Sequence, residues 1–74
     1  MKTIIIDDNK DAARNLAEHL ADYDEVSLAG IAYNGFDGLT MVSEQQPDLI
    51  FLDVQLPDIS GLDFLDRVDI FTHG

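Results

Sequence analysis

Three short apolar runs recur along the chain, and longer stretches with helical periodicity separate and follow them. The runs cover residues 2–6, 26–32 and 49–52, the lengths that strands take. Strands that alternate with helices pack as a parallel sheet joined by right-handed crossovers, because each helix carries the chain back to the start of the next strand. We therefore predict an α/β fold with the element order βαβαβα.

Each apolar run is followed by a stretch that reads as a helix. The first stretch, residues 10–21, has one apolar face with the spacing i, i+3, i+4 and i+7, made of Ala13, Leu16, Ala17 and Leu20. Asn9 or Asp11 is suited to cap it. The second, residues 36–46, contains Gly38 and is stopped by Pro47. A third is expected to begin at Gly61, with an apolar side made of Leu62, Phe64 and Leu65.

The tail, VDIFTHG at residues 68–74, fits two structures. Phe64, Val68 and Phe71 have helical spacing, which favours a longer third helix. Residues 70–72 also resemble a short fourth strand ending in a Thr. That strand would need a crossover near the minimum of about a dozen residues, so we expect the helix.

Composition narrows the possible functions. Fifteen acidic residues against four basic ones give a net charge of −11, which argues against direct binding to nucleic acid or anionic lipid. There is no Cys for disulfides or thiolate metal sites. No apolar run approaches the roughly 18 residues of a membrane span, and MKTIII lacks a signal-peptide layout. We expect one small cytoplasmic domain.

Acidic residues stand at the ends of two of the predicted strands. Asp7 and Asp8 follow the first strand, and Asp53 ends the third. If these strands are neighbours, their ends lie about 5 Å apart, and carboxylates crowded in this way either hold their protons more tightly or demand a cation. Oxygen ligands suit Mg²⁺ or Mn²⁺. The structural alternatives are a helix cap for Asp8 and a turn residue beside Pro57 for Asp53.

Three segments carry a resemblance to a known family: IIIDDN at 4–9, NGFDGL at 34–39 and PDLIFLDVQLPDISGLDFL at 47–65. The last has the family spacing at Asp53, Leu56, Pro57 and Gly61. The chain resembles the receiver domain of two-component response regulators. The resemblance implies part of a flavodoxin-like fold, with parallel strands in the order 2-1-3 and the third strand at the edge.

The resemblance also implies roles for individual residues. Asp53 resembles the aspartate that accepts a phosphoryl group from a histidine kinase or phosphotransfer protein. Asp7, Asp8 and the main-chain carbonyl of Gln55 resemble its partners in holding Mg²⁺ or Mn²⁺. Gly61 would start the third helix without a side-chain clash. Such a module is a phosphoacceptor that takes part in its own phosphoryl transfer and is not an enzyme.

The family fold continues through two more strands and two more helices, which carry a Ser or Thr and a Lys that contact the phosphate. Neither residue has a counterpart here. Lys2 and Lys10 flank the first strand as surface charges, and His19 and His73 read as ordinary surface residues. We therefore interpret residues 1–74 as a single truncated receiver-like domain.

Two other functions are consistent with the same residues. One is a self-associating fragment with a vestigial site, because an exposed third strand is a template for pairing with a second copy. The expected homodimer pairs the third strands antiparallel in a six-stranded sheet, or exchanges the third helix or the tail. The other is a phosphatase with an aspartate nucleophile. Such an enzyme needs a second acidic residue two positions after the nucleophile, where this chain has Gln55, so we rank this function last.

Overall fold

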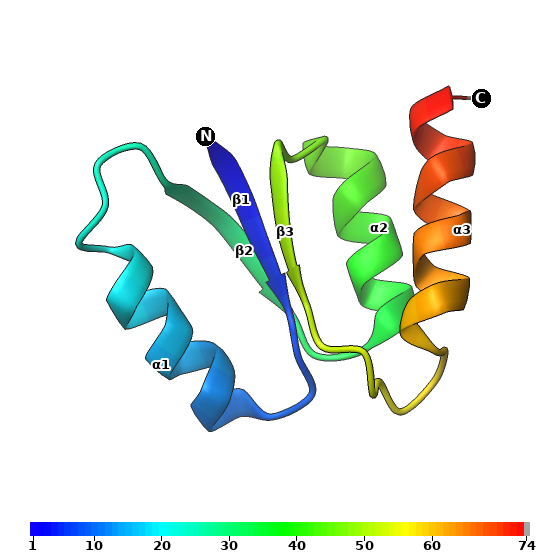
Figure 1. Cartoon of the computed structure of the whole chain (residues 1–74), viewed down its shortest axis with the longest axis horizontal. Coiled ribbons are helices and arrows are strands. Elements are labelled where there is room, and N and C mark those ends of the chain that lie inside the picture. The colour runs from blue at the N-terminus through cyan, green and yellow to red at the C-terminus, as the bar shows by residue number, and fades with distance from the viewer. Residues whose placement is uncertain (74) are drawn as a thin grey trace.

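The computed structural model describes the backbone of residues 1–73 and the side chains of residues 1–68. Strands and helices alternate along it as β1 (Lys2–Ile6), α1 (Lys10–Leu20), β2 (Ser27–Ala32), α2 (Gly35–Gln45), β3 (Leu49–Leu52) and α3 (Gly61–His73) (Figure 1). The predicted order βαβαβα is confirmed, with boundaries that differ from the predicted ones by a residue at several ends.

The three strands form one parallel sheet in the order β2-β1-β3. Ile6, the last residue of β1, pairs with Ala32 of β2 and with Leu52 of β3, so the carboxyl ends of all three strands are level. The strand β3 has β1 on one side and is the edge of the sheet on the other. The predicted fold class and strand order are confirmed.

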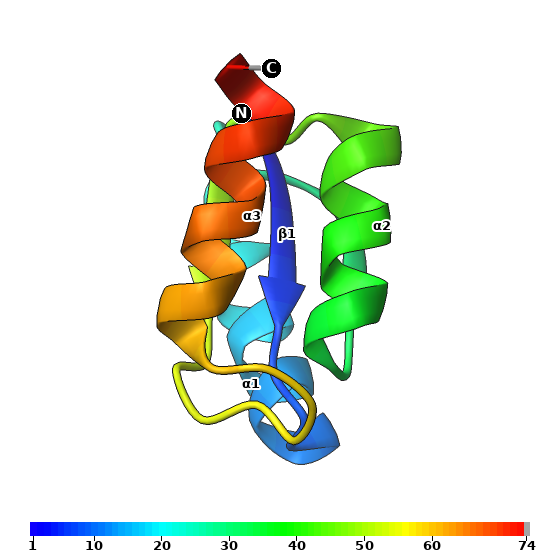
Figure 2. The ribbon, with the colours of Figure 1, turned by 90° about the vertical axis from the view of Figure 1, so that its right-hand side faces the viewer.

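The helices cover the two faces of the sheet in separate layers. In Figures 1 and 2, α2 and α3 lie side by side on one face and α1 lies on the other. Alternate residues of β1 serve the two layers, as expected for a strand covered on both faces. Ile4 and Ile6 pack with Phe64 on the side of α2 and α3, whereas Ile5 packs with Ala13 on the side of α1. The core is therefore centred on β1.

The helix ends follow the local rules of capping. The side chain of Asn9 accepts a 3.0 Å hydrogen bond from the N–H of Ala12, so Asn9 is the cap of α1 and Asp8 is not. The helix α2 ends at Gln45, and Gln46 has the left-handed backbone of a helix C-cap, with φ of 48°, directly before Pro47. Asp8 is therefore not used as the cap of α1, and its carboxylate remains available at the carboxyl end of β1.

Gly38 lies where α2 crosses β1. A Cβ at this position would stand 2.7 Å from Cδ1 of Ile6, which is well inside van der Waals contact. Glycine weakens a helix by roughly 1 kcal/mol relative to alanine. Here the missing side chain lets α2 approach β1 closely. This close approach explains why a glycine occupies the interior of a helix.

The helix α3 confirms one prediction and corrects another. It begins at Gly61 and continues through His73, so the tail is helical and the fourth strand is wrong; Gly74 and the side chains of residues 69–73 lie outside the described part of the chain. Of the predicted apolar side, Phe64 is fully buried, but Leu62 and Leu65 are 78% and 53% exposed. Phe64 and Val68, four residues apart, face the sheet, and Leu56 and Ile59 from the preceding loop fill the remaining space.

Helix length bears on a possible membrane location. The longest helix, α3, has 13 residues. Within the described residues, none of the helices has both the length and the apolar character that a bilayer crossing requires.

Candidate functional site

Two backbone hydrogen bonds extend the sheet by one residue beyond its strands. The N–H of Asp53 donates to the carbonyl of Ile6 at 2.9 Å, and the N–H of Asp7 donates to the carbonyl of Ala32 at 3.0 Å. Because Asp7 directly follows Ile6, the first bond places Asp53 beside Asp7 at the carboxyl end of the sheet, and the second ties Asp7 to β2. This is the edge at which open α/β sheets bind ligands.

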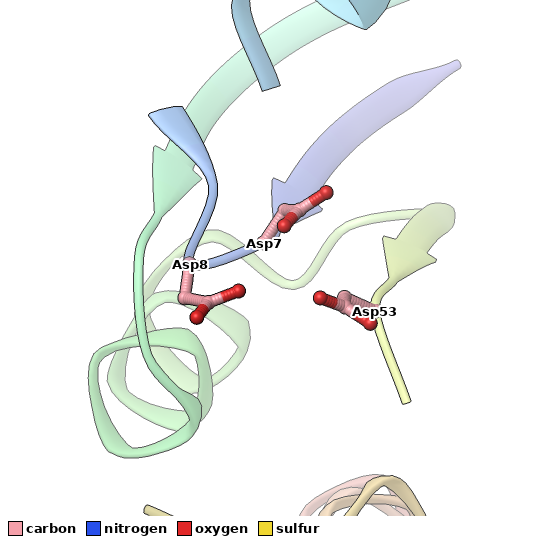
Figure 3. A group of neighbouring side chains, drawn as sticks. All are labelled: Asp7, Asp8 and Asp53. Atoms are coloured by element: carbon pink, nitrogen blue, oxygen red, sulfur yellow. The ribbon is translucent and has the colours of Figure 1, made fainter. Parts of the chain in front are cut away.

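The three predicted acids form one cluster (Figure 3). A carboxylate oxygen from each of Asp7, Asp8 and Asp53 lies within 4.8 Å of the other two. Asp7 and Asp53 are half-buried, and Asp8 is exposed. Opposite ligands of an octahedral Mg²⁺ are about 4.2 Å apart, so a small side-chain adjustment or one water would let all three serve a single ion. The donor set fits a hard divalent cation.

Local backbone donors orient two of the carboxylates. Oδ1 of Asp7 accepts a 3.0 Å hydrogen bond from the N–H of Asn9, and Oδ1 of Asp53 accepts one of the same length from the N–H of Gln55. Both are turns in which an Asp side chain bonds the backbone two residues on. The nearby Lys10 is directed elsewhere, since its Nζ lies 5.2 Å from the centre of the Tyr33 ring. The described residues thus give the cluster no hydrogen bond or salt bridge from a basic side chain.

Gln55 belongs to the loop between β3 and α3, residues 53–60. It forms an isolated antiparallel bridge with Ser60, and the N–H of Gly61 donates to the carbonyl of Val54 at 3.2 Å. A Cβ at Gly61 would lie 3.0 Å from the Cα of Val54, which accounts for a glycine at the start of α3. The role of the Gln55 carbonyl as a ligand stays a prediction.

A shallow groove opens beside the cluster. It runs between α1 and β3 and has Asp7 and Asp53 among its lining residues, together with Ile5, Ile6, Asn9, Ala12, Leu16, Phe51 and Leu52. Asp7 and Asp53 thus border open space on the side of α1.

The remaining candidates lie away from the cluster. Lys2 stands at the opposite end of β1, where its Nζ donates to the carbonyl of Gln45 at 2.9 Å and so caps the last turn of α2. His19 is exposed in the last turn of α1. Lys2 thus has a structural contact that its sequence position did not indicate, and His73 lies outside the described side chains.

One residue of the site region was not singled out from the sequence. The carboxylate of Asp58 accepts hydrogen bonds from the N–H groups of Gly35 and Phe36, at 2.7 and 2.8 Å. Partial removal of water raises the pKa of Asp58, but donors from Phe36, Gly35, Asp58 itself and Ile59 outweigh it and hold the pKa below its ordinary value. The partners lie 22 and 23 residues earlier in the chain, so no local pattern reveals the contact.

Comparison with known proteins decides the family. The sequence profile of the response regulator receiver domain matches residues 3–72. The chain belongs to the receiver domain family of response regulators. The receiver is 38% identical over 69 residues to an uncharacterized response regulatory protein of Vibrio cholerae, and 35% identical over the same length to the transcriptional regulatory protein BtsR of Escherichia coli. Each match covers 93% of this receiver and 29% of the relative.

Solved structures share the fold of this receiver. The response regulator domain of Thermotoga maritima CheB superimposes with a TM-score of 0.87 at 20% identity, over 92% of this chain and 51% of that one. The N-terminal domain of an uncharacterized Wolinella succinogenes protein gives 0.81 at 30% identity, over 95% and 55%. This chain therefore spans about half the length of these solved chains and less than a third of the curated relatives it matches.

Proposed function

We propose that this receiver acts in the cytoplasm and accepts a phosphoryl group on Asp53 from a histidine kinase or phosphotransfer protein. Asp7, Asp8, Asp53 and the main-chain carbonyl of Gln55 would hold the Mg²⁺ or Mn²⁺ ion that the reaction requires. The observation that carries the proposal is the convergence of three carboxylates within 4.8 Å at the carboxyl edge of the sheet. Membership of a family of signalling phosphoacceptors supports it.

The geometry distinguishes the two oxygens of Asp53. Oδ1 is engaged by the N–H of Gln55, and Oδ2 has no hydrogen-bond partner among the described side chains and backbone. Oδ2 is therefore the better nucleophile toward phosphorus. As the Oδ2–P bond forms, the bond from phosphorus to the donor breaks, and the leaving atom keeps its electron pair. From a phosphohistidine the leaving group is an imidazole nitrogen. The product is an aspartyl phosphate.

Charge is the main obstacle to this step. An anionic carboxylate attacks an anionic phosphoryl group beside two further carboxylates, so repulsion opposes the approach. A divalent cation held by Asp7, Asp8 and Asp53 would supply the positive charge that offsets this repulsion. The chain's own contribution is to hold Asp53 at the strand end, beside the groove, with Oδ1 fixed by the N–H of Gln55.

Acyl-phosphate formation tests the proposal directly. The protein is incubated with acetyl phosphate and Mg²⁺, and intact mass is followed over time. We expect a species heavier by one phosphoryl group that disappears when the metal is chelated. An unmodified mass under these conditions, in protein that is folded by circular dichroism, would refute the phosphoacceptor function.

A second candidate function is self-association through β3. Among the described residues this strand pairs with β1 alone, and all four of its residues are half-buried although they form the run LIFL. An apolar edge strand is a template for pairing with another chain. We propose a two-fold homodimer in which the β3 strands pair antiparallel into a six-stranded sheet, or in which α3 or the tail is exchanged, with the acidic cluster then vestigial.

Sedimentation across a concentration series separates the two candidates. The dimer requires a sedimentation coefficient that rises with concentration and slow amide exchange along Leu49–Leu52 only in the associated form. A compact monomer at high concentration with those amides already protected would exclude it. Phosphorylation of Asp53 in either state would show that the acidic site is not vestigial.

A further inference from the structure

The first turn of α2 is capped from two places in the chain. Asn34, its own N-cap, accepts a 2.8 Å hydrogen bond from the N–H of Asp37. The two preceding N–H groups, of Gly35 and Phe36, donate instead to Asp58 in the loop between β3 and α3. Three of the N–H groups that a helix start leaves without partners are thus satisfied, two of them by a distant carboxylate.

The bidentate contact of Asp58 connects α2, which is packed on the sheet, to the exposed loop between β3 and α3. The helix α2 is packed on the sheet through Leu39 and Val42, which are buried. Most of the loop of residues 53–60 is exposed, including Val54, Gln55 and Asp58. A carboxylate at a helix N-terminus makes charge-assisted hydrogen bonds, which are stronger than neutral ones. Because α2 is already anchored, the contact restrains the loop more than it restrains the helix.

The restraint is transmitted along a stiff piece of chain. Between Asp58 and Gln55 lie only Leu56 and Pro57. Proline fixes its own φ and restricts the residue before it, so few conformations are open to this segment. Leu56 also packs against the core on the side of α2 and α3. The position of Asp58 therefore limits where the backbone of Gln55 can lie.

Gln55 connects this restraint to the acidic cluster. Its N–H donates to Oδ1 of Asp53, and its carbonyl is the fourth ligand of the proposed cation site. We propose that Asp58 is a positioning residue for this site: by tying the loop to the start of α2, it holds the Gln55 backbone in the orientation that the bound cation and the Asp53 carboxylate require. This inference rests on the proposed function of the cluster.

The chain offers a matched pair of variants. Asp58→Ala removes the tether, and Asn34→Ala removes the local cap of the same helix without touching the loop. Both leave N–H groups of the first turn of α2 unpaired, so both lower stability. Only Asp58→Ala is expected to weaken Mg²⁺ binding, by on the order of tenfold, as is typical when a partner that orients metal ligands is lost. Asp58→Asn keeps one acceptor oxygen and should fall between wild type and Asp58→Ala.

The experiment measures the Mg²⁺ dissociation constant from amide NMR shifts of Asp7, Asp8 and Asp53, and the rate of phosphorylation by acetyl phosphate at saturating Mg²⁺. Thermal unfolding of each variant gives the stability change. Weaker Mg²⁺ binding in Asp58→Ala, with binding in Asn34→Ala as in wild type, supports the inference. Equal losses in both variants, or none in Asp58→Ala, overturn it. A wild-type protein that binds no Mg²⁺ at the cluster overturns the proposed function as well, so the two failures are distinguishable.

Discussion

The N–H of Asp53 donates a 2.9 Å hydrogen bond to the carbonyl of Ile6, the last residue of β1, so the ladder between the two strands runs one residue past the end of β3. This bond sets the position of Asp53 along the strand direction relative to Asp7 and Asp8, the two residues that follow Ile6. The end of β1, the most deeply buried strand of the sheet, thus positions all three residues, and their carboxylates approach within 4.8 Å of one another.

Asp53→Asn should abolish acyl-phosphate formation and leave the fold intact. Asparagine keeps the side-chain shape and an oxygen that can accept from Gln55, but it has neither the charge nor the nucleophile. Relief of repulsion with Asp7 and Asp8 should raise the unfolding midpoint slightly. Intact mass after treatment with acetyl phosphate checks the first claim and thermal unfolding the second. A phosphorylated species in the variant would mean that another residue is the acceptor.

Gly38→Ala should lower the free energy of unfolding even though alanine is the better helix former. A Cβ there would lie 2.7 Å from Cδ1 of Ile6, and overpacking of this kind costs about 1–3 kcal/mol, against a gain of roughly 1 kcal/mol in helix propensity. Ser43→Ala, at an exposed position of the same helix, is the control and should be neutral or slightly stabilising. Urea denaturation measures both; a stabilised Gly38→Ala would contradict the close approach of α2 and β1.

Phe64→Ala should be far more damaging than Leu62→Ala. Phe64 is fully buried between α3 and the sheet, and truncation of such a side chain costs about 3–5 kcal/mol, a large part of the stability of a small domain. Leu62 is 78% exposed, and its truncation should change little. Circular dichroism and thermal unfolding compare the two. Similar losses would show that Leu62 is covered in solution, for example by a second copy.

The contribution of Asp58 to stability should disappear in acid. Its pKa is lowered in the folded state, so the carboxylate stabilises the fold above the ordinary pKa of aspartate, and this stabilisation is lost as the pH falls through the lowered value. The difference in unfolding midpoint between wild type and Asp58→Ala should therefore shrink as the solution is acidified from neutral pH. A constant difference would show that the contact does not depend on the charge of Asp58.

The sequence was informative where the determining contacts are local or periodic. The alternation of apolar runs and helical stretches predicted the order of the elements, and Asp7, Asp8 and Asp53 were identified as a group because strand ends meet at one edge. The resemblance to receiver domains supplied the order 2-1-3, which the pattern alone does not. The proposed roles of these residues, and the interpretation of residues 1–74 as a single truncated domain, stay predictions.

The errors and omissions come from contacts between distant segments. Leu62 and Leu65 are apolar and lie within two residues of Phe64, but successive helical residues are about 100° apart, so of these three side chains Phe64 alone reaches the sheet. Nothing in the sequence distinguished Asp58 from the other acidic residues, because its hydrogen-bond partners in α2 lie more than twenty residues away. Gly38 looked unfavourable because its reason, the side chain of Ile6, is on another element.

Titration with Mg²⁺, followed by amide NMR shifts, is the most direct test of the central claim that Asp7, Asp8 and Asp53 form one cation site. We predict saturable shifts centred on these three residues and on Gln55, with weak affinity because few protein ligands are available, and their loss in the Asp53→Asn variant. Shifts spread evenly over the acidic surface, and unchanged by that substitution, would contradict the claim.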